Sequence, residues 1–222
     1  MNELFFFLHV AILVISVLAS LKLGKEALIA ILAVQVILAN LLVTKQTTLF
    51  GLNVTCSEVY TIGALFSLNL VQTYFGKKKA QEGLVITFFL LLFVVVMSQT
   101  HLRYLPSKYD SMHPIFVRLF DSTPRIMLSS FFCALITQKL DLELFALLKK
   151  KLPFLPFFTC FALSSLVTQL FDTVLFSFMA LYGVIYSIKD IIFMSYTVKA
   201  IAIFSVAPFT VCIKRWIRNV PF

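Results

Sequence analysis

Hydrophobic residues fall into seven long blocks along the chain, separated by short polar stretches. Each block approaches the length of about 20 residues that a transmembrane helix needs. The pattern therefore predicts an all-α polytopic membrane protein, built as a bundle of six to seven transmembrane helices. The predicted spans cover residues 4–21, 27–43, 54–75, 83–100, 124–147, 154–182 and 188–213.

We expect residues 1–222 to form a single transmembrane domain. The first apolar block begins with the acidic residue Glu3 and is long enough to span, which disfavours a cleaved signal peptide. Residues 1–24 are interpreted as a retained, peripheral first helix beside a core that covers residues 25–213.

Composition supports a lipid environment. The chain is 60% hydrophobic and 15% aromatic, and it is only 13% charged, about half the usual share of a globular protein. A soluble domain of this length could not bury so much apolar surface. The lipid bilayer is therefore the expected solvent for most of the chain.

Basic residues alternate between the loops, although the net charge is +9. Lys22 with Lys25, 77–79, 149–151 and 214–218 supply the dense basic runs, and the intervening loops lack them. By the positive-inside rule we expect the N-terminus outside and the C-terminus in the cytoplasm, in the inner (cytoplasmic) membrane. The runs serve topology, so no nucleic-acid partner is predicted.

The outer segment 101–123 mixes aromatic and charged residues with three prolines. Within it, residues 113–120 ("HPIFVRLF") are expected to form a short interfacial helix. The segment can be read as an ordinary surface loop or as a lid over a binding site.

The sixth span keeps a polar stripe at membrane depth. Ser165, Thr168, Gln169 and Asp172 follow the spacing of one helix face. An ionisable side chain at the bilayer centre costs about 2.5–3.5 kcal/mol on insertion scales, so it normally faces a bundle interior or a wet cavity.

The last span carries Lys199 on the same face as Tyr196. At 1.5 Å per residue, Lys199 lies about 15 Å into its span, a depth comparable with that of Asp172 on the preceding antiparallel helix. We therefore expect an ion pair between Asp172 and Lys199.

Polar residues on other spans extend this interior. Their convergence predicts a solute pocket inside the bundle, whereas the alternative is that they only join helices through hydrogen bonds. The candidate substrate-binding residues are Asn40, Glu58, Asn69, Gln72, Arg125, Gln169, Asp172, Tyr196 and Lys199.

The sequence offers no reaction centre. Its four cysteines are far apart and the expectation is that they are free thiols, and its three histidines are scattered. No HExxH, GxSxG or paired-aspartate pattern is present. We therefore predict no enzyme activity, no metal and no cofactor.

Six fragments resemble a known family in their order and spacing. They are "ANLLVTK" (39–45), "SLNLVQTYFGKKKAQ" (67–81), "TPRIMLSS" (123–130), "ITQKLDLELF" (136–145), "SSLVTQLFDTVLF" (164–176) and "SYTVK" (195–199). Together they resemble the queuosine precursor transporters, also described as vitamin-uptake-type membrane proteins, over about residues 25–213. Asn69 and Thr73 depart from the pattern, since Asp and Glu are expected there in many relatives.

The resemblance implies import of a 7-deazaguanine: queuine, or the 7-cyano or 7-aminomethyl base. It also implies a fold similar to the substrate-binding subunits of energy-coupling-factor transporters and alternating access to a central polar pocket. Two alternatives stay open: a subunit that needs an ATPase partner, and a structural membrane protein. The sequence also leaves open whether the chain forms homo-oligomers.

Overall fold

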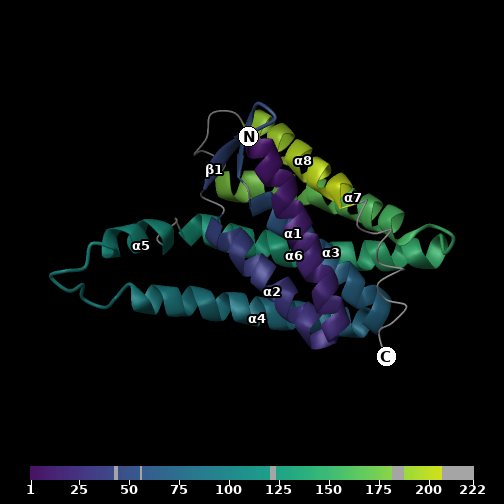
Figure 1. The fold of residues 1–222 in the computed structure, drawn as a ribbon, viewed down its shortest axis with the longest axis horizontal. Helices are drawn as coiled ribbons and strands as arrows, with labels where there is room; N and C mark the ends of the chain where they lie inside the picture. Colours follow the sequence, from purple (N-terminus) through teal and green to yellow (C-terminus); the bar gives the residue numbers. More distant parts are fainter. Residues whose placement is uncertain (43–44, 56, 121–123, 182–187, 207–222) are drawn as a thin grey trace.

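The computed structural model of the chain describes residues 1–42, 45–55, 57–120, 124–181 and 188–206. Within these ranges the fold is almost entirely helical, with one β-hairpin near the N-terminal end (Figure 1). The elements are α1 (Asn2–Leu23), α2 (Lys25–Leu42), β1 (Gln46–Leu49), β2 (Leu52–Thr55), α3 (Ser57–Phe75), α4 (Lys77–His101), α5 (His113–Phe120), α6 (Pro124–Lys151), α7 (Phe157–Phe176), the π-helical segment η1 (Ser177–Leu181) and α8 (Ile188–Ser205).

Two single glycines reverse the chain between long helices. Gly24 joins α1 to α2 with φ 112°, and Gly76 joins α3 to α4 with φ 89°. A residue with a Cβ atom rarely adopts a positive φ, whereas glycine does so at little cost. These glycines therefore allow one-residue connections, which place α2 against α1 and α4 against α3 (Figure 1).

The β-hairpin is a feature that the hydrophobic pattern does not predict. Its strands pair antiparallel from Gln46↔Thr55 to Leu49↔Leu52 around the turn residues Phe50 and Gly51, both with positive φ. Asn2 Nδ2 donates to Thr48 O (3.0 Å) and Phe50 N donates to the Glu3 side chain (3.3 Å). The hairpin is thereby attached to the first turn of α1.

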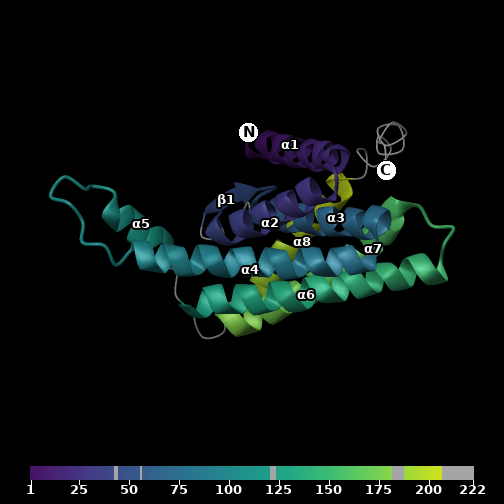
Figure 2. The same ribbon diagram turned by 90° about the horizontal axis from the view of Figure 1, so that it is seen from below.

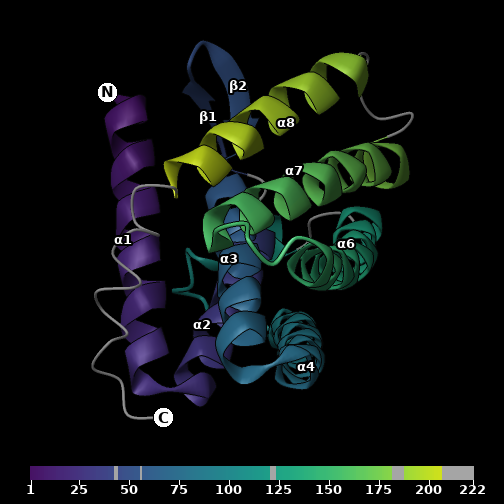
Figure 3. The same cartoon turned by 90° about the vertical axis from the view of Figure 1, so that its right-hand side faces the viewer.

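The first helix lies along the bundle and crosses the other helices (Figures 1 and 3). It contacts α2, α3 and α8. The side chains that it buries recur along its whole length: Phe6, Val10, Leu13, Val14, Val17, Leu18 and Leu21. This spacing gives α1 one continuous packed face. That residues 1–24 are peripheral to the transporter core stays a prediction.

The long helices α4 and α6 lie side by side, and α7 and α8 pack against each other (Figures 2 and 3). The end of α4 and α5 project from the bundle, joined where Gln99 Nε2 donates to Phe120 O (3.0 Å). The predicted short helix over 113–120 is thus confirmed as a helix, while its place at a membrane interface stays a prediction.

The outward face of α4 is apolar. Val85, Phe89, Phe93 and Val96 are all exposed and share one side of this helix. A protein in water would bury such a stripe, whereas a membrane protein presents it to lipid. Four described helices are long and apolar enough to cross a membrane: α1, α2, α4 and α7 extended to Met179.

The helix α3 and the long helix α6 fall outside that group, and both carry polar residues that face the interior, such as Asn69 and Asp141. The fold confirms the predicted polytopic helical bundle. Several boundaries differ from the prediction. The basic residues Lys22 and Lys25, 77–79 and 149–151 belong to helix ends and not to loops, and the predicted third span, 54–75, begins within β2.

A small residue at position 63 is required where α1, α2 and α3 meet. A Cβ atom there would collide with Gln35 Oε1 and with the Leu13 side chain, both of which are buried. We expect Gly63→Ala to destabilise the protein by about 1–3 kcal/mol, as overpacking usually does. The measurement is the thermal unfolding midpoint of the purified protein in detergent.

Gly83→Ala is the matched control for this change. Its Cβ would meet Ile29 Cγ1 at 3.2 Å, a contact that a shift of a few tenths of an ångström would relieve. Both variants gain about the same helix propensity, about 1 kcal/mol. Equal midpoints for the two variants would contradict the close packing of α1 against α3.

Candidate functional site

A polar cavity lies among α2, α3, α6, α7 and α8. Its volume is about 90 Å³, enough for several water molecules. The charged residues among its described lining residues are Glu58, Asp172 and Lys199. The remaining lining residues are Val36, Ala39, Asn40, Ser57, Thr61, Ala64, Leu65, Cys133, Ala134, Thr137, Gln138, Gln169 and Phe176.

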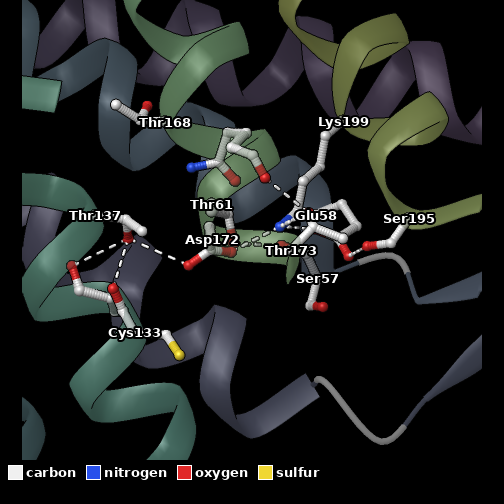
Figure 4. Close-up of polar contacts among 12 residues, drawn as sticks. Ser57, Glu58, Thr61, Cys133, Thr137, Thr168, Asp172, Thr173, Ser195 and Lys199 are labelled. Carbon is white, nitrogen blue, oxygen red and sulfur yellow. Dashed lines mark hydrogen bonds and ion pairs between the residues drawn. The ribbon is translucent and has the colours of Figure 1, made fainter. Parts of the chain in front are cut away.

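Lys199 is the centre of the cavity's polar contacts (Figure 4). Its Nζ donates to Asp172 Oδ2 (2.7 Å) and to Thr173 Oγ1 (3.1 Å), and it lies 3.5 Å from Glu58 Oε2. The side chain is 5% exposed, against 14% for each carboxylate. The three ammonium hydrogens therefore have three oxygen partners. We call Glu58, Asp172 and Lys199 the cavity triad.

Both carboxylates have a further donor. Thr137 Oγ1 on α6 donates to Asp172 Oδ1 (3.2 Å), and Ser195 Oγ on α8 donates to Glu58 Oε1 (2.7 Å). Ser195 is one turn before Lys199, so α8 presents a donor and a cation to the first turn of α3 (Figure 4). The triad thus joins α3, α7 and α8, and Thr137 adds α6.

The helix α7 changes its winding just beyond these residues. The π-helical segment η1 follows Phe176, which lines the cavity. Cys133 Sγ of the cavity wall lies 3.8 Å from Met179 Sδ in this segment. π-Helical turns inside α-helices are rare and are found often at functional sites, in keeping with the position of this one.

A second polar cluster lies one helical turn from the cavity. Asn69 Nδ2 donates to Asp141 Oδ2 (2.8 Å), and Thr168 Oγ1 donates to Asp141 Oδ1 (3.2 Å). Asp141 and Asn69 are fully buried and Thr168 is 3% exposed. We call these three residues the Asp141 cluster. It joins α3, α6 and α7.

The structure brings several of the predicted site residues together. The predicted ion pair between Asp172 and Lys199 is present, and Glu58, Asn40 and Gln169 line the same cavity. Their role in binding a substrate stays a prediction.

Other predicted residues lie elsewhere. Asn69 is part of the Asp141 cluster, and Gln72 Nε2 donates to Leu142 O on α6 (3.1 Å). Tyr196 is half-buried on α8 but is not among the lining residues. Arg125 belongs to the first turn of α6, and its side chain lies outside the described part of the structure.

The sequence reasoning missed one wall of the cavity. Cys133 and Thr137 line it from α6, and Thr137 contacts Asp172 directly. Cys133, Thr137 and Asp141 follow one another at intervals of four residues, the spacing of a single helix face. That spacing was the signal that could have identified them.

A larger cavity of about 440 Å³ lies on the side of α3 that faces α1. Its wall includes the rings of Phe5, Phe6, His9 and Tyr60, and His9 packs edge-on against Tyr60 with ring centroids 4.6 Å apart. Among the described residues that line this larger cavity, Lys45 is charged and none is a carboxylate. The smaller cavity, with its paired charges, is the better candidate for polar recognition.

Among the described residues, no group of three or more His, Cys, Asp or Glu side chains could hold a metal ion. Cys133 and Cys160 are buried free thiols, as expected, and Cys56 and Cys212 lie outside the described residues.

Comparison with known proteins now bears on the identity of this helical bundle. A sequence model of the family described as "Putative vitamin uptake transporter" matches residues 57–213, more than half of the chain. The chain belongs to this family. The match contains the cavity triad and the Asp141 cluster, whereas α1, α2 and the β-hairpin precede it. The vitamin uptake transporter family and the apolar helices together make this chain a multi-pass membrane transporter.

A curated relative from Bacillus subtilis (strain 168) carries the name "Probable queuosine precursor transporter". It is 26% identical over 184 residues, which cover 82% of this chain and 80% of the relative. No solved structure matches the chain. The family resemblance predicted from the six sequence fragments is therefore confirmed.

The cavity triad makes a testable contribution to stability. Lys199→Met would leave two carboxylates in the protein interior without their cation, which typically costs about 3–5 kcal/mol. We expect a large fall in the thermal midpoint of the purified protein. The combined variant Glu58→Gln, Asp172→Asn and Lys199→Met should recover most of the loss, because neutral groups need no counter-charge.

Lys77→Met is the control, since it removes an ion pair with Glu143 at 2.7 Å whose side chains are 42% and 49% exposed. Solvent screens such a pair, so the midpoint should change little. If Lys199→Met and Lys77→Met were equally stable, the cavity triad would not be a buried charge network.

Proposed function

We propose that this chain imports queuosine precursors, namely 7-deazaguanine bases, by binding them at the cavity triad. The observation that carries the proposal is the buried set of two carboxylates and one ammonium in a cavity shared by five helices. The name of the Bacillus subtilis relative supplies the substrate class. We place the transporter in the inner membrane with its N-terminus outside and its C-terminus in the cytoplasm, from the alternation of basic runs.

The hydrogen-bonding edge of a deazaguanine suits these groups. N1–H and the 2-amino group are adjacent donors that one carboxylate accepts together, and O6 is an acceptor that an ammonium can serve. Of the two carboxylates, Glu58 has the longer contact with Lys199, 3.5 Å against 2.7 Å for Asp172. We infer that Glu58 exchanges its contact with Lys199 for the ligand, while Asp172 keeps the ammonium in place.

Gln169 and Asn40 at the cavity wall add amide groups for the remaining polar edge of the base. Phe176 supplies an aromatic ring beside them. A site that pairs every polar edge rejects analogues that leave a buried partner unsatisfied.

The size of the cavity indicates how a base would reach it. Ligand pockets usually measure about 300–1,000 Å³, whereas this cavity holds about 90 Å³. The described conformation is therefore contracted, and binding requires α3, α6, α7 or α8 to move apart. Such a movement around a central polar site is what alternating access demands of a transporter.

Uptake by cells tests the proposed function directly. Cells that lack their own importer would express the parent chain or Asp172→Asn at matched membrane levels, and would receive labelled queuine or 7-aminomethyl-7-deazaguanine. We expect uptake by the parent and a loss of at least about tenfold in the variant, equivalent to about 1.4 kcal/mol of lost interaction.

Glu143→Gln provides the matched control, because it neutralises a half-exposed carboxylate on α6. It should leave uptake unchanged. Background uptake by the parent for every base would refute import of queuosine precursors. Parent-like uptake by Asp172→Asn would instead remove the cavity triad from the binding site.

The charge of the triad makes a second prediction about substrate preference. Two carboxylates and one ammonium in their ordinary charged forms carry one net negative charge, which a cationic 7-substituent would neutralise. Glu58→Gln removes this surplus. Through the lost ring contact we expect it to reduce uptake of both bases, and through the lost charge to reduce uptake of the cationic 7-aminomethyl base about tenfold more than that of the neutral 7-cyano base.

The measurement is uptake of the two labelled bases side by side in one set of cells. Their ratio is insensitive to expression level and to modest destabilisation. An equal loss for both bases would show that Glu58 recognises the common ring and not the substituent.

A further inference from the structure

Among the described residues, the carboxyl group of Asp141 has no cationic partner. It is fully buried, and none of the ion pairs among the described residues includes it. Its partners include the amide of Asn69 and the hydroxyls of Thr168 and Ser164, all of them neutral groups. Asp172, in contrast, forms an ion pair with Lys199. The two interior aspartates therefore differ, because the contacts given for Asp141 all come from neutral groups. An isolated charge in such a place is very unfavourable.

Several amide oxygens around Asp141 are without a hydrogen-bond donor. Asn69 Oδ1, Gln138 Oε1 and Gln169 Oε1 are all buried and lack a hydrogen-bond donor. Gln138 is one turn before Asp141 on α6, and Gln169 adjoins Thr168 on α7. Gln72, one turn after Asn69, likewise leaves its Oε1 without a donor. Each unsatisfied buried acceptor costs free energy, about 1–3 kcal/mol.

A cation would correct both defects at once. A proton on Asp141 removes its charge and creates an O–H donor for one of the amide oxygens. A sodium ion would instead be bound directly by carboxylate and amide oxygens, which hard cations prefer. A proton and a sodium ion have this chemistry in common: each is one positive charge bound among oxygen atoms of α3, α6 and α7.

The position of Asp141 connects it to the cavity. Thr137, which donates to Asp172, is one turn before Asp141 on α6, and Thr168 is one turn before Asp172 on α7. Gln138 and Gln169 line the cavity and also flank the Asp141 cluster. The cluster therefore lies directly beyond the cavity, toward the helix ends that carry 77–79 and 149–151.

We propose that Asp141 binds the coupling ion of transport, a proton or Na⁺, which crosses the membrane together with the base. With the ion bound, the neutral cluster holds α3, α6 and α7 together beyond the cavity. With the ion released, the carboxylate needs water, so these helices separate and open a path on that side. The step forms and breaks only the bond between the carboxyl group and the ion. This proposal rests on the proposed transport function.

Two charged groups on the helices packed around Asp141 have ion-pair partners of their own. On α4, Lys77 pairs with Glu143 of α6, and on α7 Asp172 pairs with Lys199. The remaining titratable groups of the described side chains on the helices packed against α6 and on α6 itself are Glu58, Tyr60 and Tyr74 of α3; Lys78, Lys79, Glu82 and His101 of α4; Cys133, Lys139, Lys149, Lys150 and Lys151 of α6; and Cys160 of α7.

Purified protein in liposomes provides the test. Vesicles with the membrane potential clamped at zero would receive a tenfold inward gradient of either H⁺ or Na⁺, with the other ion equal on both sides. The probes are labelled 7-cyano- and 7-aminomethyl-7-deazaguanine, and protein-free vesicles under the same gradient supply the background. For coupling of one ion to one base, a tenfold gradient supports about tenfold accumulation.

We expect one of the two ions to drive accumulation by the parent and to have no effect on Asp141→Asn. The variant should still exchange external labelled base for internal unlabelled base, because the cavity triad is intact. Glu143→Gln, two residues along α6 and half-exposed, should accumulate like the parent. Accumulation by Asp141→Asn equal to that of the parent would overturn the proposal.

A measurement on the parent alone removes any dependence on folding of the variant. A pH-sensitive or Na⁺-sensitive dye inside the vesicles should report entry of the ion when base is added outside. Exchange without ion entry and without gradient-driven accumulation would overturn the coupling proposal while leaving the proposed function intact. Absence of both exchange and uptake for every base would overturn both.

Discussion

The contact between Lys199 and Asp172 is the interaction on which the interior depends. A lone ammonium or carboxylate at this depth would be expelled from a bilayer core, so each of the helices α7 and α8 can keep its charge only beside the other. The pair in turn attracts Glu58 from α3 and Thr137 from α6. Four helices are thereby held around one polar point, and the cavity lies beside it.

The need to pair each buried charge also explains which parts of the site could be predicted from the sequence. Asp172 and Lys199 belong to consecutive helices at similar depth, so helical geometry alone predicts that they meet. Glu58 is 137 residues from its partner Ser195, and no local pattern reveals that α3 and α8 touch. Helical periodicity also predicts on which face of its helix a residue lies, but it does not predict which residue of a neighbouring helix lies opposite. Asn69 and Gln72 accordingly face the interior as predicted, yet they contact α6 beyond the cavity.

The β-hairpin could not be predicted from the sequence for a different reason. The strands "QTTL" and "LNVT" are only four residues long, and they flank a turn that places Phe50 at φ 53°. Phenylalanine rarely adopts this conformation, so the turn carries no recognisable signal beyond Gly51. The hairpin is determined instead by its attachment to Asn2 and Glu3 of α1, a contact between segments that lie more than forty residues apart. Tertiary contact, not local propensity, forms these strands.

The two buried aspartates suggest a division of labour within the bundle. Asp172 is paired with Lys199, which suits it to hold or orient, whereas Asp141 is the group that we propose gains and loses a positive partner. A transporter that moves a solute against its gradient needs both kinds of group, one that recognises the solute and one whose occupancy changes during the cycle. Thr137 and Asp141 on α6, with Thr168 and Asp172 on α7, place the two one turn apart on the same pair of helices. A movement of α6 against α7 that widens the cavity must therefore also disturb the contacts of Asp141, which gives the two sites a direct mechanical connection.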